Sequence, residues 1–570
     1  MSVRRTLGLA ALLFGSVPAS AKQVALAAPA AAPRNDRWIL SVVGTNDLHG
    51  HVEQLPILGG YLHNLRESLN EGHRGELVLL DGGDLFQGTI ESNASEGEAV
   101  VAAYNLLGYD ASAIGNHEFD FGPVGEARPW RKTDDPRGAL KARALQAKFP
   151  FLSANLVDTV TGKQVGWPHL PGSVILDRRG LSIGVIGLST VDTPTTTMES
   201  NFIGLRIAPL AETVITEAKS LRARGAKLIF VVAHAGGDCK NVEDPNDLSS
   251  CHPDEEIFKL ARALPIGTVD LIVGGHTHAG VAHEVFGIPI IESYDHARAF
   301  GRVDFTIEQL ADGGRAVAHH IFPPKRMCNL DSPCDYQGHP VKKDSTVETL
   351  MAPYIKQAEA RRAAPLGVKV VGRVARSYKE ESPLGNLIAD LMRAARPGAD
   401  VAIMNGGGLR AELPAGPLTY GEMYEIYPFD NAFATLKVPA RAFAAWLARN
   451  LTMDAGIISL SGLRASAGCE GGQPHVTLTR ESGKRVGDDE ILKVLSSDFL
   501  ATGAEGLSQQ AGAPYRVEKD SLVRETLVDF LKKRGGAIDP NDRTLFDAAH
   551  KRFSYPGKRP LRCGEVPAKE

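Results

Sequence analysis

The stretches that decide the fold are Thr45-Asn46-Asp47-Leu48-His49-Gly50, Gly82-Gly83-Asp84, Gly115-Asn116-His117-Glu118, Ala233-His234-Ala235 and Gly274-Gly275-His276-Thr277-His278. Each follows an apolar, strand-like segment, at residues 39–43, 77–80, 111–114, 228–232 and 269–273. In an open α/β sheet, the loops that leave the carboxyl ends of the strands gather in one crevice, and ligands bind there. The five stretches therefore predict one site that is rich in carboxylate, amide and imidazole groups.

The residue types in these stretches are those of a site for two divalent cations. Asp84 follows two glycines, which allow close backbone approach, and its two carboxylate oxygens make it the candidate bridge between the ions. Mixed nitrogen and oxygen ligands suit Zn²⁺, Mn²⁺ or a similar ion, and the remaining candidates are Asp47, His49, Asn116, His234, His276 and His278. Two metal ions can hold both the attacking and the leaving oxygen of a displacement at phosphorus. The chain is therefore predicted to be a phosphoester hydrolase with two divalent metal ions as cofactors.

Two further residues complete the predicted chemistry. Asp47 and His49 can face one ion only if the strand ends between them, which Gly50 favours. His117 adjoins Asn116, so we expect it to donate a proton or a hydrogen bond to the phosphate, with Asp120 fixing its tautomer. Any one of these residues could instead be a surface or capping residue. Five stretches in this order argue against that alternative for the set, but for Asp120 alone it stays open.

The length and the pattern of the chain predict two domains. A chain of 570 residues is too long for one ordinary core, and short strands alternate with helical stretches from residue 38 to 305. A charged helical stretch at 346–362 then precedes a second α/β region. The expected divisions are a signal peptide at 1–21, a flexible leader at 22–35, a phosphoesterase domain at 36–335, a linker and bridging helix at 336–366, a C-terminal domain at 367–556 and a tail at 557–570.

The N-terminus and the charge balance indicate an exported protein. Arg4-Arg5 precede an apolar run at 7–15, and Ala19-Ser20-Ala21 supplies a signal-peptidase site. The run is too short to anchor the chain in a membrane, so we expect a periplasmic or secreted location, reached by ordinary secretion or by twin-arginine export. A formal net charge of −4 does not indicate a basic surface that would bind nucleic acid or anionic lipid. The expected partner is a small-molecule substrate, and the oligomeric state is left open.

The six cysteines are expected to form disulfides. An even number of cysteines in an exported chain favours disulfides, and no pair has the close spacing of a zinc knuckle. We predict Cys239 with Cys251 and Cys328 with Cys334, which leaves Cys469 with Cys563.

The N-terminal motifs resemble those of the calcineurin-like metallophosphoesterases. Phe119-Asp120-Phe121-Gly122 and Gly88 narrow the resemblance to the 5'-nucleotidase family. The resemblance implies an α/β fold of two domains, an N-terminal sandwich with helices flanking β-sheets and a smaller C-terminal α/β substrate-binding domain. It assigns Asp47, His49, Asp84 and His278 to the first ion. It assigns Asp84, Asn116, His234 and His276 to the second ion, and His117 and Asp120 to the stabilisation of the transition state.

The C-terminal half contains residues suited to a nucleotide. Asn405-Gly406-Gly407-Gly408-Leu409-Arg410 joins a glycine turn to a cation, which can bind phosphate. Phe429 and Phe499 each stand beside turn residues and could stack on a base, which contributes about 1–3 kcal/mol per base, although either alone could be a core residue. The resemblance assigns phosphate contact to Arg410, base stacking to Phe429 and Phe499, and base contact to Asn431. It also places Asn405 and Gly408 in the same substrate-binding motif as Arg410.

The chain departs from the family pattern at two places. The family binds the ribose hydroxyls with Asp at a position where this chain has Glu505, which is one methylene longer. Many relatives carry a further phosphate-binding arginine where Tyr378 or Lys379 stands here, and Arg373 or Arg376 could replace it.

These observations together predict an exported 5'-nucleotidase that hydrolyses nucleoside 5'-monophosphates. The alternatives on the same scaffold are a UDP-sugar hydrolase, a 2',3'-cyclic-nucleotide phosphodiesterase and a thiosulfohydrolase of sulfur oxidation. An exported nucleotide-binding protein without activity would be expected to lack at least one metal ligand, and none is missing. A structural surface protein would be expected to carry an anchor or repeats.

Overall fold

The computed structural model describes residues 37–563 except 126–132, 310–313, 454 and 504–505. The predicted signal peptide, the leader and Glu505 lie outside the described residues. Residues Arg37–Glu570 cluster as one compact unit. No helix in the described part of the chain is both long enough and apolar enough to cross a membrane.

The N-terminal domain is built on two six-stranded sheets. The first sheet has the order β14-β13-β1-β2-β3-β4, and its members are β1 (Arg37–Thr45), β2 (Gly75–Asp81), β3 (Ala111–Ala113), β4 (Phe151–Leu152), β13 (Ala299–Glu308) and β14 (Arg315–Arg326). The second has the order β11-β12-β10-β9-β7-β6, and its members are β6 (Ser173–Arg178), β7 (Leu181–Ser189), β9 (Leu228–His234), β10 (Leu271–Val273), β11 (Gly280–Val285) and β12 (Ile288–Ser293). The strands that precede the metal motifs are parallel to their neighbours: β1 with β2, β2 with β3, and β9 with β10.

Alternation along the strands explains why two sheets form. On β1, Val42 belongs to the hydrophobic cluster shared by the two sheets, whereas Val43 belongs to the cluster on the outer face. Because successive side chains of a strand point to opposite faces, a strand that is apolar on both faces needs a layer on each side. The inner layer is the other sheet, and the outer layers are helices.

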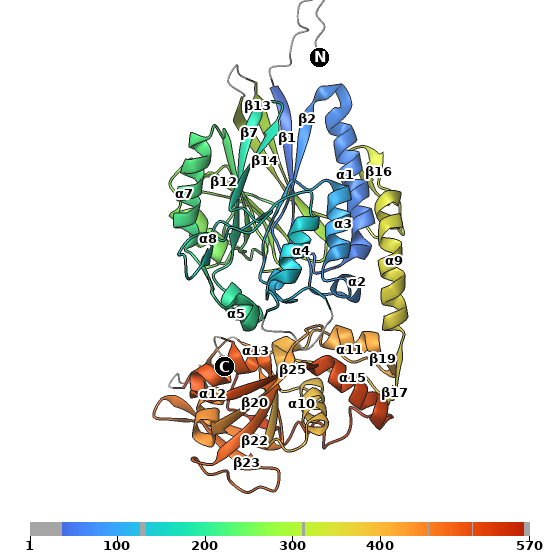
Figure 1. Cartoon of the computed structure of the whole chain (residues 1–570), viewed down its shortest axis with the longest axis vertical. Helices are drawn as coiled ribbons and strands as arrows, with labels where there is room; N and C mark the ends of the chain where they lie inside the picture. The colour runs from blue at the N-terminus through green and yellow to red at the C-terminus, as the bar shows by residue number, and fades with distance from the viewer. Residues whose placement is uncertain (1–36, 126–132, 310–313, 454, 504–505, 564–570) are drawn as a thin grey trace, which may run out of the picture. The chain divides into compact units, whose positions relative to one another are not determined.

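Helices cover both outer faces, as Figure 1 shows. Helices α1 (Leu55–Asn70), α3 (Glu98–Leu107) and α9 (Ser345–Arg362) share a cluster with the outer face of the first sheet. Helices α7 (Leu210–Ala223) and α8 (Glu256–Ala263) share a cluster with the outer face of the second. The predicted sandwich with flanking helices is confirmed.

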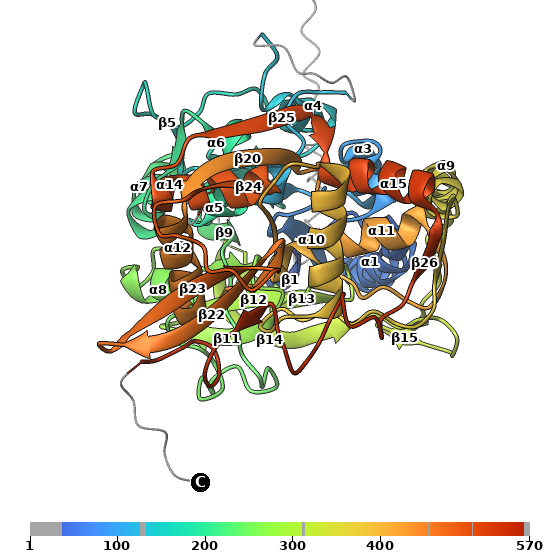
Figure 2. The same ribbon diagram turned by 90° about the horizontal axis from the view of Figure 1, so that it is seen from below.

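The C-terminal domain has a five-stranded sheet with a hydrophobic cluster on each side. Its order is β21-β18-β24-β20-β25, and its members are β18 (Val401–Asn405), β20 (Ala432–Pro439), β21 (Ile458–Ser461), β24 (Ile491–Ser497) and β25 (Tyr515–Leu522). One cluster includes residues of α10 (Pro383–Ala395), α11 (Tyr420–Ile426) and α15 (Val523–Arg534), and Figure 2 shows these three helices from below. The other includes residues of α12 (Ala440–Thr452) and of the hairpin β22 (Leu463–Glu470) and β23 (Gln473–Arg480).

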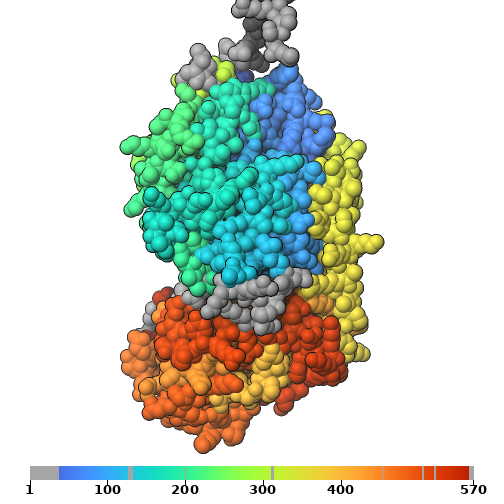
Figure 3. Space-filling model, in the orientation of Figure 1, coloured from blue at the N-terminus to red at the C-terminus, as the bar shows by residue number. Residues whose placement is uncertain are grey.

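Helix α9 contributes to the cores of both domains. Val347 and Met351 belong to a cluster of the N-terminal domain, whereas Ala358 belongs to a cluster of the C-terminal domain. Figure 3 shows its yellow surface running beside the blue N-terminal elements. We propose that the domains meet within the predicted bridging segment 336–366, and that the C-terminal domain extends to Cys563, since Leu561 and Cys563 pack against its second cluster.

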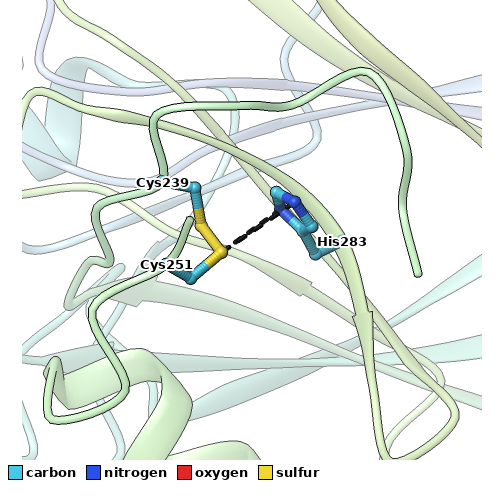
Figure 4. Close-up of side chains that lie close together, drawn as sticks. All are labelled: Cys239, Cys251 and His283. Atoms are coloured by element: carbon cyan, nitrogen blue, oxygen red, sulfur yellow. Dashed lines mark hydrogen bonds between the residues drawn. A yellow bond between two sulfur atoms is a disulfide. The ribbon is translucent and has the colours of Figure 1, made fainter. Parts of the chain in front are cut away.

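The three predicted disulfides are confirmed as Cys239 with Cys251, Cys328 with Cys334, and Cys469 with Cys563. Figure 4 shows the first beside the buried His283, whose ring nitrogens lie 3.9 Å from Cys251 Sγ. These three residues have the types and the proximity of a metal site, but the two sulfur atoms are bonded to each other. The disulfide closes the acidic insertion that leads from β9 to α8.

Candidate metal centre and substrate site

The metal motifs come from two sheets rather than from one open sheet. The loops after β1, β2 and β3 belong to the first sheet, whereas the last residue of β9, His234, and the loop after β10 belong to the second. A Cβ at Gly82 would lie 2.5 Å from the carbonyl oxygen of Gly274, so only glycine permits this approach of the two sheets. The expectation of a crevice at one open sheet is therefore wrong, because the site forms where the carboxyl ends of two sheets meet.

The backbone at the predicted ligands adopts an uncommon conformation. Strand β1 ends at Thr45, before both Asp47 and His49, and not between them as the sequence suggested. Asp47 has φ 50° and His49 has φ 48°, and positive φ values also occur at Asp84, His276 and His278. Residues other than glycine rarely adopt this region, and such strain is typical of functional sites.

The predicted ligands gather into two groups. The ligand atoms of Asp47, His49 and His278 lie within 4.8 Å of one another, and so do those of Asp84, His234 and His276. Asp84 faces both groups, because its Oδ2 lies 3.0 Å from His234 Nε2 and 3.9 Å from His49 Nε2. Asn116 joins the second group through its Oδ1, which lies 3.0 Å from His234 Nε2. The structure therefore brings the seven predicted ligands together with Asp84 between the two groups, and their role as metal ligands stays a prediction.

The donor set fits divalent cations. Asp47 Oδ1 is buried and has no hydrogen-bond partner among the described residues, and a buried polar atom without a partner is costly. The Nε2 atoms of His49 and His278 face each other at 3.0 Å. A cation bound by these atoms would satisfy the carboxylate oxygen and the lone pairs of neutral imidazoles.

Partners outside the ligand set fix the histidine tautomers. His49 Nδ1 lies 2.8 Å from the carbonyl oxygen of Gln87, and His234 Nδ1 lies 2.9 Å from that of Gly82. His278 Nδ1 lies 3.2 Å from the carboxylate of Asp295. Since each contact requires an Nδ1–H donor, Nε2 is left free to bind an ion. Asp295 was not predicted, although it lies two residues after the end of strand β12, as the predicted ligands lie near the ends of their strands.

Protonation follows from burial and from the neighbouring charges. Burial lowers the pKa of His49 to about 3, which keeps its ring neutral. Burial also opposes the protonated form of His234, but the Asp84 carboxylate outweighs this and raises the pKa of His234 to about 10. Metal binding at His234 must therefore displace a proton.

A buried carboxylate ties two ligand loops together. Glu118 Oε2 accepts hydrogen bonds from the backbone N–H groups of Asp84 (3.0 Å) and Gly115 (2.6 Å), and its Oε1 accepts one from Leu85. Burial and the nearby Asp84 raise the pKa of Glu118 to about 8. Glu118 stands within a motif that the sequence analysis quoted, yet no role was predicted for it.

His117 and Asp120 form the predicted pair. His117 Nδ1 lies 2.5 Å from Asp120 Oδ2, and Asp120 Oδ1 accepts a hydrogen bond from Thr197 Oγ1 at 2.9 Å. The backbone N–H of His117 also donates to Asp84 Oδ1. Burial lowers the pKa of His117, but Asp120 and Asp84 outweigh this and raise it above its usual value. His117 thus stands beside the metal ligands with its Nε2 available for a substrate.

The predicted substrate residues in the described part of the C-terminal domain lie at or near the ends of its strands β18, β20 and β24. Strand β18 ends at Asn405. The Oδ1 atom of Asn405 lies so close to Gly408 that a Cβ added at Gly408 would be only 2.8 Å from it. The Arg410 guanidinium lies over the Phe429 ring at 5.0 Å, and the Phe429 ring lies 6.2 Å from the His117 ring. Asn431 Oδ1 accepts a hydrogen bond from Tyr427. The structure therefore brings Arg410 and Phe429 close to His117.

Phe499 stands apart from Phe429 in its packing. It lies on α13 (Asp498–Thr502) and packs against the cluster that contains α12, whereas Phe429 packs against the cluster that contains α10. Stacking of a base between the two rings remains a prediction.

Comparison with known proteins agrees with this geometry. Residues 40–280 match the calcineurin-like phosphoesterase family, and residues 362–512 match the 5'-nucleotidase C-terminal domain. The chain belongs to the 5'-nucleotidase family. It is a phosphoric monoester hydrolase whose catalytic domain uses divalent metal ions.

The relatives of this 5'-nucleotidase family member span nearly the whole chain. It is 27% identical over 542 residues to protein UshA of Yersinia enterocolitica, with 88% of this chain and 92% of the relative covered. It is 27% identical over 578 residues to a 5'-nucleotidase of Vibrio cholerae, with 93% and 97% covered. A 5'-nucleotidase precursor of Thermus thermophilus has the same fold, with a TM-score of 0.65, 23% identity and 89% of this chain and 100% of that chain covered.

Proposed function

We propose that this protein is exported and hydrolyses nucleoside 5'-monophosphates to nucleoside and phosphate. The observation that carries the proposal is the position of Arg410 and Phe429 beside His117 and the two metal-ligand groups. A nucleotide whose base and phosphate are held by the C-terminal domain would present its phosphate to the metal centre. The relatives named 5'-nucleotidase support this substrate class, and the three disulfides support export.

The protein would hold two divalent ions, Zn²⁺, Mn²⁺ or a similar metal. Asp47, His49 and His278 would hold one, Asn116, His234 and His276 the other, and Asp84 would contact both. When bound, the ions supply Lewis acidity at the phosphoryl oxygens.

The protein's own residues would bind the substrate and place a proton. Asp120 accepts a hydrogen bond from the Nδ1–H of His117 and compensates the charge of the imidazolium, whose Nε2–H can then donate to a phosphoryl oxygen. Arg410 would bind the phosphate, Phe429 and Phe499 would stack on the base, and Asn431 would contact the base edge. The role of Glu505 toward the ribose remains a prediction.

The substrate class is tested by measuring the first hydrolysis product of each substrate with metal-reconstituted protein: phosphate from AMP, UMP and glucose 1-phosphate from UDP-glucose, adenosine monophosphate from 2',3'-cyclic AMP, and p-nitrophenol from bis-(p-nitrophenyl) phosphate. We expect the highest kcat/KM with AMP, since one phosphate and one base match the residues described. A preference for UDP-glucose or for the cyclic nucleotide would instead support those alternatives. Turnover of only the artificial diester would mean that the C-terminal domain does not select nucleotides.

The structure also favours one of the two arginines that the sequence left open. Arg373 pairs with Glu412, and 69% of its side chain is exposed. Arg376 instead lies near Arg410, whose pKa is lowered by burial and by the Arg376 charge, and Arg376 Nε has no hydrogen-bond partner among the described residues. Two neighbouring cations that repel each other can both be stabilised by an anion bound between them. We therefore propose that Arg376 and Arg410 bind the phosphate together.

Replacing Arg376 with methionine is expected to raise KM for AMP by roughly 10- to 100-fold, the range of a lost charge-assisted hydrogen bond. Arg373→Met is the matched control and is expected to leave KM within a factor of about two. Steady-state kinetics with AMP and inhibition by inorganic phosphate measure both variants. A larger effect at Arg373 than at Arg376 would reverse the assignment.

A further inference from the structure

The residues proposed to contact the base lie on a segment without regular secondary structure. Helix α11 ends at Ile426 and strand β20 begins at Ala432, so residues 427–431 form an irregular loop that carries both Phe429 and Asn431. An irregular loop has no ladder of backbone hydrogen bonds to hold it in place. Stacking requires a defined ring orientation, so another part of the fold must fix this loop.

Arg524 contacts this loop at three of its residues. Its Nη1 donates to the carbonyl oxygens of Tyr427 and Phe429, each at 3.3 Å, and its Nη2 donates to the carboxylate of Asp430. The preceding residue contributes a fourth contact, because the Val523 N–H donates to the Asn431 carbonyl oxygen at 2.8 Å. The start of α15 therefore holds almost every residue of the loop.

The guanidinium itself is held in one orientation. Only 4% of Arg524 is exposed, its Nε donates to Glu525 at 3.0 Å, and its Cζ lies 4.4 Å from the centre of the Tyr424 ring. Two carboxylates, Asp430 and Glu525, compensate its buried charge. The rigid fork of an arginine can direct two nitrogen atoms at the loop while a third binds elsewhere, which the single ammonium of a lysine cannot do.

We propose that Arg524 is a positioning residue for base recognition, which sets the loop 427–431 so that Phe429 and Asn431 can meet a nucleobase. The inference deepens the proposed function and depends on it. Arg524 lies beyond residues 362–512, which match the 5'-nucleotidase C-terminal domain, and it lies on a helix distant in sequence from the loop. The ligand class concerned is the nucleoside part of the substrate, not its phosphate.

The test compares substrates with and without a base. We expect Arg524→Lys to raise KM for AMP by about tenfold or more, the range of one lost stacking contact. The effect on p-nitrophenyl phosphate, which has no nucleobase, is expected to be at least about fivefold smaller. Equal effects on the two substrates, or an unchanged KM for AMP, would overturn the proposal, because a merely structural ion pair would not distinguish them.

Two further variants keep the test decisive. Arg396→Lys is the matched control, since Arg396 also pairs with a carboxylate, Glu518, and also lies over a ring, Phe433, but contacts no residue of the loop in the described structure. Asp430→Asn removes one anchor of Arg524 and should raise KM for AMP in the same direction if Arg524→Lys fails to fold. No rise with Asp430→Asn would then count against the proposal.

A failure of the proposed function is distinguishable from a failure of this inference. If the wild-type protein hydrolyses p-nitrophenyl phosphate but not AMP, the nucleotidase proposal fails. Equilibrium dialysis with adenosine then tests the loop directly. Weaker adenosine binding by Arg524→Lys than by the wild type would support the positioning role, and equal or absent binding in both would overturn it.

Discussion

Replacing His117 with alanine is expected to lower kcat for AMP hydrolysis by about two to four orders of magnitude, the usual contribution of a positioned acid or base. The residue adjoins the ligand Asn116, is held by Asp120 at 2.5 Å, and faces the ring of Phe429. KM should change much less than kcat, because the phosphate and base contacts remain. Steady-state kinetics on metal-reconstituted protein measure both values.

The metal content of the His117 variant separates its role from that of a ligand. We expect two ions per chain in the variant and in the wild type, measured by atomic emission. His63→Ala is a suitable control, because His63 is an exposed histidine that pairs with Glu67 on α1. A kcat within about threefold of the wild type, or the loss of an ion, would contradict the assigned role.

Replacing Asp84 with asparagine should have the second large effect, because this residue faces both ligand groups. Asparagine retains the size of the side chain and an acceptor for the His117 N–H, but it removes the negative charge that offsets the repulsion between two cations. Two-metal stabilisation contributes several kcal/mol, so we expect kcat/KM to fall by about 10³-fold or more. At least one ion per chain should also be lost.

Asp254→Asn serves as the control for Asp84, since Asp254 is an exposed carboxylate on the insertion between β9 and α8. Activity and metal content should be measured at the same metal concentration for the wild type and both variants. Retention of two ions with less than a tenfold loss of kcat/KM would show that Asp84 does not bridge the ions.

The sequence could single out the seven residues that the structure brings together as candidate metal ligands, because their signal is local. A polar residue directly after an apolar strand is visible in a window of about ten residues, and parallel strands present their carboxyl ends at one edge. The same locality explains the success with α9, whose first residue differs from that of the expected stretch 346–362 by one position. Two of the disulfides were predicted because their cysteines lie close together in the sequence, and the third was predicted because two cysteines were left over.

Other features depend on residues that only the fold brings together. Asp295 contacts His278, which is 17 residues away in the sequence. Arg524 contacts the loop that carries Phe429, which is more than ninety residues away in the sequence. Arg373 and Arg376 have the same chemistry in the sequence, and the fold distinguishes them by pairing Arg373 with Glu412 and placing Arg376 near Arg410.

The sequence by itself determined the chemistry of the metal ligands, the order of the domains and the family. Tertiary structure decided that two sheets, not one, meet at the site, and that Asp47 and His49 turn toward it with positive φ after β1 has ended. The physical reason is that side-chain chemistry and strand periodicity are properties of short segments. The approach of two sheets at Gly82 and Gly274, and the loops held by Asp295 and Arg524, arise from packing between distant segments, which no local pattern encodes.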